Sequence, residues 1–184
     1  MAYFEDLSEY GYHGAPPINR FSKEIAVGWL DQEHDFYKAP PAEELLDLIW
    51  TYCKVSIAQT RGLHECELCI PPKIVHATRH GESLELGSSE IRVFSDGGPI
   101  YAAPTLIYHY VRTHHYKPPD EFLRALRETT GPPAQEYFEQ LKKFELDWQE
   151  TLTPPLNPKM YRTEKISGEV RRVEVPYPVC LDES

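Results

Sequence analysis

The sequence predicts an α+β fold, in which one domain combines a small region of strands and hairpins with about four helices. Three observations support this prediction. Short β-like runs fill residues 55–101, and segments with a helical spacing of apolar residues lie on both sides of them. The 17 prolines mark most of the element boundaries. The chain shows no internal repeat and no clear domain boundary, so residues 1–184 are expected to form a single domain.

The first part of the chain is predicted to hold loops, a strand and a central helix. Residues 1–22 place five aromatic side chains among glycines and prolines, so we expect a loop-rich segment that covers the core. Residues 23–30 are typical of a short strand. Pro40 and Pro41 then open a helix, because proline suits the first helical position. Apolar residues surround much of this helix, which is therefore expected to be central: Leu45, Leu46, Leu48, Ile49, Trp50 and Tyr52.

The middle of the chain is predicted to form strands followed by a helix. Candidate strands cover residues 73–78, 83–86 and 90–94. Ser-Asp-Gly-Gly at 95–98 follows the third of them and is a strong signal for a hairpin turn. A helix is expected over residues 104–115, ending before a Pro-Pro pair.

The last third is predicted to contain two helices and a hairpin. Asp120 is expected to cap a helix that ends near Gly131. A longer helix then runs to about Thr151, with an apolar stripe that favours a side facing the core. Two β-like runs, 161–166 and 169–175, flank a Ser-Gly pair and predict a hairpin.

The charge balance narrows the classes of function. The chain carries 29 acidic and 19 basic residues, a formal net charge of -10 and a pI of about 5.3. This balance argues against a general nucleic-acid binder, since phosphate contacts need clustered cations. No stretch approaches the ~20 apolar residues that span a bilayer, and the first residues do not resemble a signal peptide. We therefore expect a cytoplasmic protein with no membrane contact and four reduced cysteines.

The strongest chemical signal is a set of cysteines and histidines with metal-ligand spacing. Cys66 and Cys69 form a C-x2-C knuckle, in which two intervening residues let both sulfurs reach one ion. After 39 residues, His109 and His114 follow on the predicted helix. A knuckle, a hairpin and a helix that carries the last two ligands is the order of a treble-clef zinc finger. We therefore expect a treble-clef-like zinc site within residues 55–117.

Two other ligand arrangements stay open. On an ideal helix the two histidines lie about 140° apart, so they converge on one ion only if the last turn tightens or unwinds. His64 stands just before the knuckle and is an alternative ligand, combined with one of the helical histidines. In the third arrangement Cys66 and Cys69 are a reduced pair without metal, and the histidines are hydrogen-bonded in the core.

A four-ligand site closes the zinc tetrahedron and leaves no position for water, which favours a structural over a catalytic ion.

The predicted elements divide the single domain into four named units. They are the loop-rich segment (1–22), the knuckle, hairpin and helix unit (55–117), the helical pair (118–153) and the Pro-rich tail with its hairpin (154–184).

Several stretches resemble an uncharacterised bacterial family of small proteins that contain a zinc knuckle. The resemblance covers residues 1–125 and implies that His64, Cys66, Cys69, His109 and His114 act as one unit. It implies no known activity. The segments that carry it are YFEDLSEY (3–10), VGWL (27–30), QTRGLHECELC (59–69), LGSSEIRV (86–93) and YAAPTLIYHYVRTHHYKPPDEF (101–122).

These observations favour a non-enzymatic protein-binding module, stabilised by zinc, whose acidic surface meets a partner with a basic surface. A toxin-neutralising or immunity protein would fit, because opposite charge speeds association. The alternative is a zinc-dependent hydrolase, with His64, Glu65 and Arg61 beside the metal. A nucleic-acid-binding zinc finger is the second alternative, although its helix offers only Arg112 and Lys117. The sequence specifies neither the partner nor the oligomeric state.

Overall fold

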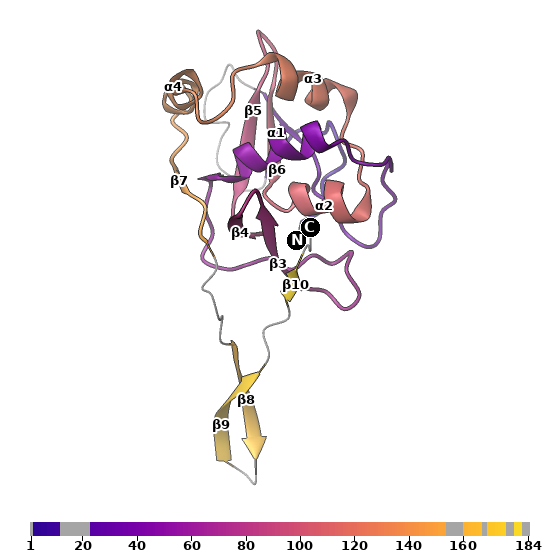
Figure 1. Ribbon diagram of the computed structural model, residues 1–184, viewed down its shortest axis with the longest axis vertical. Helices are drawn as coiled ribbons and strands as arrows, with labels where there is room; N and C mark the ends of the chain where they lie inside the picture. Colours follow the sequence, from indigo (N-terminus) through magenta and orange to yellow (C-terminus); the bar gives the residue numbers. More distant parts are fainter. Residues whose placement is uncertain (1, 12–22, 154–159, 167–168, 176–178, 182–184) are drawn as a thin grey trace.

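The structure is a computed structural model that describes residues 2–11, 23–153, 160–166, 169–175 and 179–181. Its strands form three sheets, and helices lie beside the largest of them (Figure 1). The predicted α+β class and the expected number of helices are confirmed. The four helices of the described residues are α1 (Glu43–Cys53), α2 (Ile107–His114), α3 (Asp120–Glu128) and α4 (Gln135–Lys143).

The largest sheet has five strands in the order β1-β6-β5-β2-β7. The predicted turn at 95–98 joins β5 to β6, and the two strands pair antiparallel from Glu90 with Pro104 to Phe94 with Ile100. Strand β1 runs parallel to β6, whereas the other neighbours are antiparallel. The bounds are β1 (Glu24–Ala26), β2 (Val55–Ile57), β5 (Glu90–Phe94), β6 (Ile100–Pro104) and β7 (Trp148–Glu150).

Two smaller sheets complete the fold. In the first, the order is β10-β3-β4, with β10 (Val179–Leu181) parallel to β3 (Ile74–Arg79) and β3 antiparallel to β4 (Glu82–Leu86). The second is the predicted hairpin of β8 (Met160–Ile166) and β9 (Glu169–Val175), whose antiparallel pairing is confirmed. Its Ser-Gly turn lies outside the described residues. Figure 1 shows this hairpin extending away from the helices.

Helix α1 is central, as its apolar circumference predicts. Leu46, Ile49 and Trp50 are buried, and the helix contacts α2, α3 and strand β5. It begins two residues after Pro41, with Glu43 in its first turn, where a carboxylate favours the positive end of the helix dipole. Helix α2 lies against it and so occupies a fixed place beside the core (Figure 1).

Three expectations about helix ends differ from the structure. Helix α2 begins at Ile107 rather than at 104, because Pro104 pairs with Glu90 at the end of β6. Asp120 is the first helical residue and makes no side-chain cap bond. Helix α4 stops at Lys143 instead of near Thr151. Glu145 takes a left-handed φ of 56°, which turns the chain so that the next residues become strand β7 on β2.

A charged cluster is buried where β1, β5 and the N-terminal segment meet. The Arg92 guanidinium is 2% exposed, with Nε 2.8 Å from Glu24 Oε1 and Nη1 2.6 Å from Glu90 Oε2. The Tyr10 hydroxyl donates to the other oxygen of Glu90 at 2.6 Å. The carboxylates hold the pKa of Arg92 above its ordinary value despite its burial. This cluster ties residues 2–11 to the sheet, whereas residues 12–22 of the expected loop-rich segment lie outside the described residues.

Replacing the buried cation tests how much this cluster contributes to the free energy of unfolding. Arg92→Met would leave two carboxylates without their partner, so we expect the free energy of unfolding to fall by about 3–5 kcal/mol in urea titrations. Arg127→Met on the exposed side of α3 is the control and should change it by no more than about 0.5 kcal/mol. Equal small effects of both substitutions would contradict this account.

Candidate metal centre

The knuckle cysteines lie in a short loop that the backbone closes. The Cys66 N–H donates to the Lys73 carbonyl at 2.7 Å, and the Lys73 N–H donates back at 3.3 Å. Strand β3 begins at the next residue, so the loop is fixed to the second sheet. Burial raises the pKa of the Cys66 thiol, and backbone hydrogen bonds from Cys69 and Leu68 act in the opposite direction with a smaller effect.

Helix α2 carries the two histidines, and its last turn departs from an ideal helix. The N–H groups of His115 and Tyr116 both bond to the Tyr110 carbonyl, and His115 takes a left-handed φ of 58°. Bonds that span five and six residues instead of four widen the turn, so each residue rotates less about the axis. The structure therefore resolves the predicted divergence of His109 and His114 by a widened helix end. Their ring centroids lie 5.0 Å apart.

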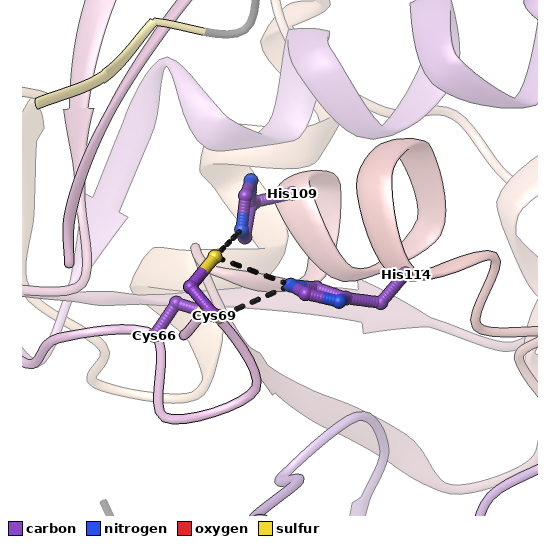
Figure 2. Close-up of side chains that lie close together, drawn as sticks. All are labelled: Cys66, Cys69, His109 and His114. Atoms are coloured by element: carbon purple, nitrogen blue, oxygen red, sulfur yellow. Dashed lines mark hydrogen bonds between the residues drawn. The ribbon is translucent and has the colours of Figure 1, made fainter. Parts of the chain in front are cut away.

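The four side chains converge on one point, as Figure 2 shows. His114 Nε2 lies 3.3 Å from Cys66 Sγ and 3.5 Å from Cys69 Sγ, and His109 Nε2 lies 3.4 Å from Cys69 Sγ. One ligand atom from each residue lies within 4.8 Å of all the others. In a tetrahedron with ordinary zinc–sulfur and zinc–nitrogen bonds, the sulfur–nitrogen edge is about 3.5 Å. The residues present therefore fit a tetrahedral metal ion.

Burial makes this donor set costly without a cation. Cys66 and His109 are fully buried, Cys69 is 9% exposed and His114 is half-buried. Burial, and then the neighbouring Cys69 thiol, raise the pKa of the Cys66 thiol. A cation between the sulfurs would offset both effects, since thiolates are the metal-binding form.

A threonine supports one of the metal-facing imidazoles. Thr113 Oγ1 lies 3.2 Å from His109 Nδ1, the ring nitrogen that faces away from the cysteines. This contact orients the ring and leaves Nε2 for a metal, the arrangement common around ligating histidines. Sequence analysis did not identify Thr113, although its position four residues after His109 places it on the same helix face.

The other sequence candidates lie outside the group of four. His64 is half-buried, and burial lowers the pKa of its imidazole. The backbone N–H of His64 donates to the Gly87 carbonyl. A Cβ at residue 87 would lie 2.4 Å from the His64 carbonyl oxygen, so this close approach requires glycine. Arg61 and Glu65 are exposed. The structure therefore brings together Cys66, Cys69, His109 and His114, without His64.

Comparison with known proteins gives one match. The family described as "Domain of unknown function (DUF7919)" matches residues 2–127, more than half of the chain and both halves of the Cys/His group. No curated protein and no solved structure matches. Within the described residues, none of the helices has the length and apolar character needed to cross a membrane.

The Thr113 contact is tested by changing the hydroxyl without touching a ligand. Thr113→Val removes the oxygen that holds His109, so we expect zinc affinity to fall about 10–100-fold in competition with a chromogenic chelator. Thr113→Ser keeps the hydroxyl and should retain nearly the original affinity. If valine and serine bind zinc equally well, the hydroxyl has no role in orienting the ring.

Proposed function

The chain belongs to the DUF7919 family of unknown function, and we propose from its own metal centre that it is a zinc-stabilised, non-enzymatic binding protein. The observation that carries the proposal is the convergence of two cysteines and two histidines, with their ligand atoms within 4.8 Å of one another. In this proposal Cys66, Cys69, His109 and His114 hold one ion. The ion fixes the fold and takes part in no reaction.

Zinc is the metal that this donor set favours. Two thiolates and two imidazoles in a tetrahedron suit Zn²⁺, whereas Mg²⁺ and Ca²⁺ prefer oxygen ligands. The group of four contains no carboxylate. Zinc also has no redox chemistry of its own and accepts the tetrahedral arrangement without electronic preference.

A structural role fits better than a catalytic one. Catalytic zinc sites use three protein ligands and keep one position for water, whereas four protein donors complete the tetrahedron. Cys66 and His109 have no exposed surface, so access to the ion is limited to the side of Cys69, which is 9% exposed, and the half-buried His114. The hydrolase alternative would require one of these four ligands to leave the ion and admit a water.

The ion would join two segments that are distant along the chain. Cys66 and Cys69 belong to the loop that leads into β3, and the two histidines belong to α2, which packs on α1. Because this site is absent from the unfolded chain, the free energy of zinc binding adds to the free energy of folding.

A partner with a basic surface is the proposed target of the stabilised protein. The support is the formal net charge of -10, which would attract a cationic protein such as a toxin and speed its association. Nucleic acid is a poorer partner, because the two cations considered for a zinc finger, Arg112 and Lys117, are engaged. Arg112 donates to the Thr78 carbonyl and the Tyr108 hydroxyl, and Lys117 pairs with Asp120.

The first experiment measures metal content by elemental mass spectrometry on untagged protein. We expect about one zinc per wild-type chain and none in Cys69→Ser. The same variant should lose about 5 kcal/mol or more of unfolding free energy, which corresponds to a fall in Tm of about 10–20 °C.

Cys53→Ala provides the matched control, because Cys53 is also buried but donates to the Thr105 carbonyl instead of lying in the group of four. It should keep its zinc. Wild-type protein without metal would contradict the proposal. Zinc lost from Cys69→Ser with an unchanged Tm would contradict the structural role and favour a catalytic ion.

A further inference from the structure

A pocket of about 420 Å³ lies beside the chain that follows α2. Three segments enclose it: residues 3–7, residues 30–37 and the connection 117–120 between α2 and α3. We call it the N-terminal pocket. Its volume is in the range of sites that hold a small molecule or a single large side chain.

Aromatic rings form much of the wall of this pocket. Tyr3, Phe4, Phe36 and Tyr37 line it, and Tyr37 is 83% exposed at its margin. The face of an aromatic ring attracts a cation. Phe36 already holds a cation of this chain, since the Lys38 ammonium lies 4.9 Å from its ring centroid, and Tyr3 stacks on His34 with ring centroids 3.7 Å apart. The exposed ring of Tyr37 is therefore the one on which a further cation would rest.

The charged groups of the N-terminal pocket are mostly acidic. Its described lining contains four carboxylates and one cation, Lys117, whose ammonium lies 3.0 Å from Asp120, and a second cation, Lys38, lies over the lining ring of Phe36. The three remaining carboxylates are Glu5, Asp6 and Asp35.

The lining therefore carries more negative than positive charge, and two of its groups have raised pKa values. Burial raises the pKa of Tyr3, and the charges of Glu5, Asp31 and Asp6 raise it further. Burial also raises the pKa of Asp6, which accepts hydrogen bonds from the Gly28 N–H and the Tyr116 hydroxyl and from no cation that the structure describes.

We propose that the N-terminal pocket binds a lysine or arginine side chain of a basic partner protein. The inference rests on the proposed binding function and adds the place and chemistry of contact. Carboxylates supply the counter-charge, and the aromatic wall accepts the cation and its apolar stem. Tyr37 and Leu7, which are 83% and 41% exposed, extend this surface outward, so a protein fits better than a free amine.

The pocket is connected to the metal centre through the backbone. Lys117, part of its wall, follows His114 by three residues, and its N–H donates to the Tyr37 carbonyl at 2.8 Å. The Ala39 N–H donates to the His115 carbonyl at 2.8 Å. An ion that orders the end of α2 would therefore also hold two walls of the pocket in place.

The test uses fluorescein-labelled nona-arginine as the probe and anisotropy at about 150 mM salt, where general charge attraction is partly screened. Wild-type protein should bind. Glu5→Gln/Asp35→Asn should weaken binding at least about fivefold. Glu128→Gln/Glu136→Gln removes the same charge from exposed positions on α3 and α4 and should weaken it less than about twofold. Equal losses in the two double variants, or no binding by wild type, would overturn the proposal.

A second pair of variants tests the aromatic wall without changing charge. Tyr37→Ala should weaken nona-arginine binding about two- to fivefold, whereas Tyr37→Phe keeps the ring and should bind like wild type. Arginine amide serves as the small-cation probe. If it binds as tightly as the peptide, the pocket serves a free cation and the proposal of a protein partner is wrong.

Zinc content separates this proposal from the previous one. None of these substitutions changes a metal ligand, so every variant should retain its zinc and its Tm. Pocket variants that lose peptide binding but keep zinc support the pocket. A wild-type protein that lacks zinc but binds the peptide in a pocket-dependent way would refute the metal proposal alone.

Discussion

The close approach of two thiols and two imidazoles in a buried site is the constraint on which the surrounding structure depends. Contacts between the cysteine sulfurs and the histidine nitrogens, at 3.3–3.5 Å, join the loop before β3 to the end of α2. Helix α2 in turn packs on α1, the central helix, and the chain after α2 bonds to residues 37–39. Once the proposed ion is bound, polar groups that are costly to bury become ligands of that ion. The loop and the helix that carry them are then held in fixed positions relative to each other.

Local sequence signals were sufficient to predict the β5–β6 hairpin and the place of α1. The hairpin of β5 and β6 follows from its Ser-Asp-Gly-Gly turn, and the apolar circumference of α1 predicts its central place. The end of α4 could not be predicted, because the apolar stripe continues past Lys143 to Trp148. Residues 148–150 pair with β2 as a strand instead of continuing the helix. The spacing of apolar residues along the chain cannot indicate such a tertiary contact. Strand β10 was missed for the same reason.

Some features of the candidate site follow from the sequence, and others depend on the folded backbone. Ligand types and the C-x2-C spacing are chemical requirements, so they identify Cys66 and Cys69 and leave three candidate histidines, His64, His109 and His114. The choice between His64 and the second helical histidine depends on the widened turn at Tyr110, which is a backbone property of the folded chain. The N-terminal pocket was not predicted, because its walls come from three segments that only folding brings together.

The positions of β7 and β10 have a consequence for the part of the chain that matches the family. Both strands lie beyond residue 127, where the match ends. Strand β7 nevertheless covers the outer side of β2, and β10 covers that of β3. A fragment limited to the matched region would expose both strands as open sheet edges, with rows of unpaired N–H and carbonyl groups that invite association between copies. The described strands after residue 127 thus occupy, within the same chain, two sheet edges that the matched region alone would leave open.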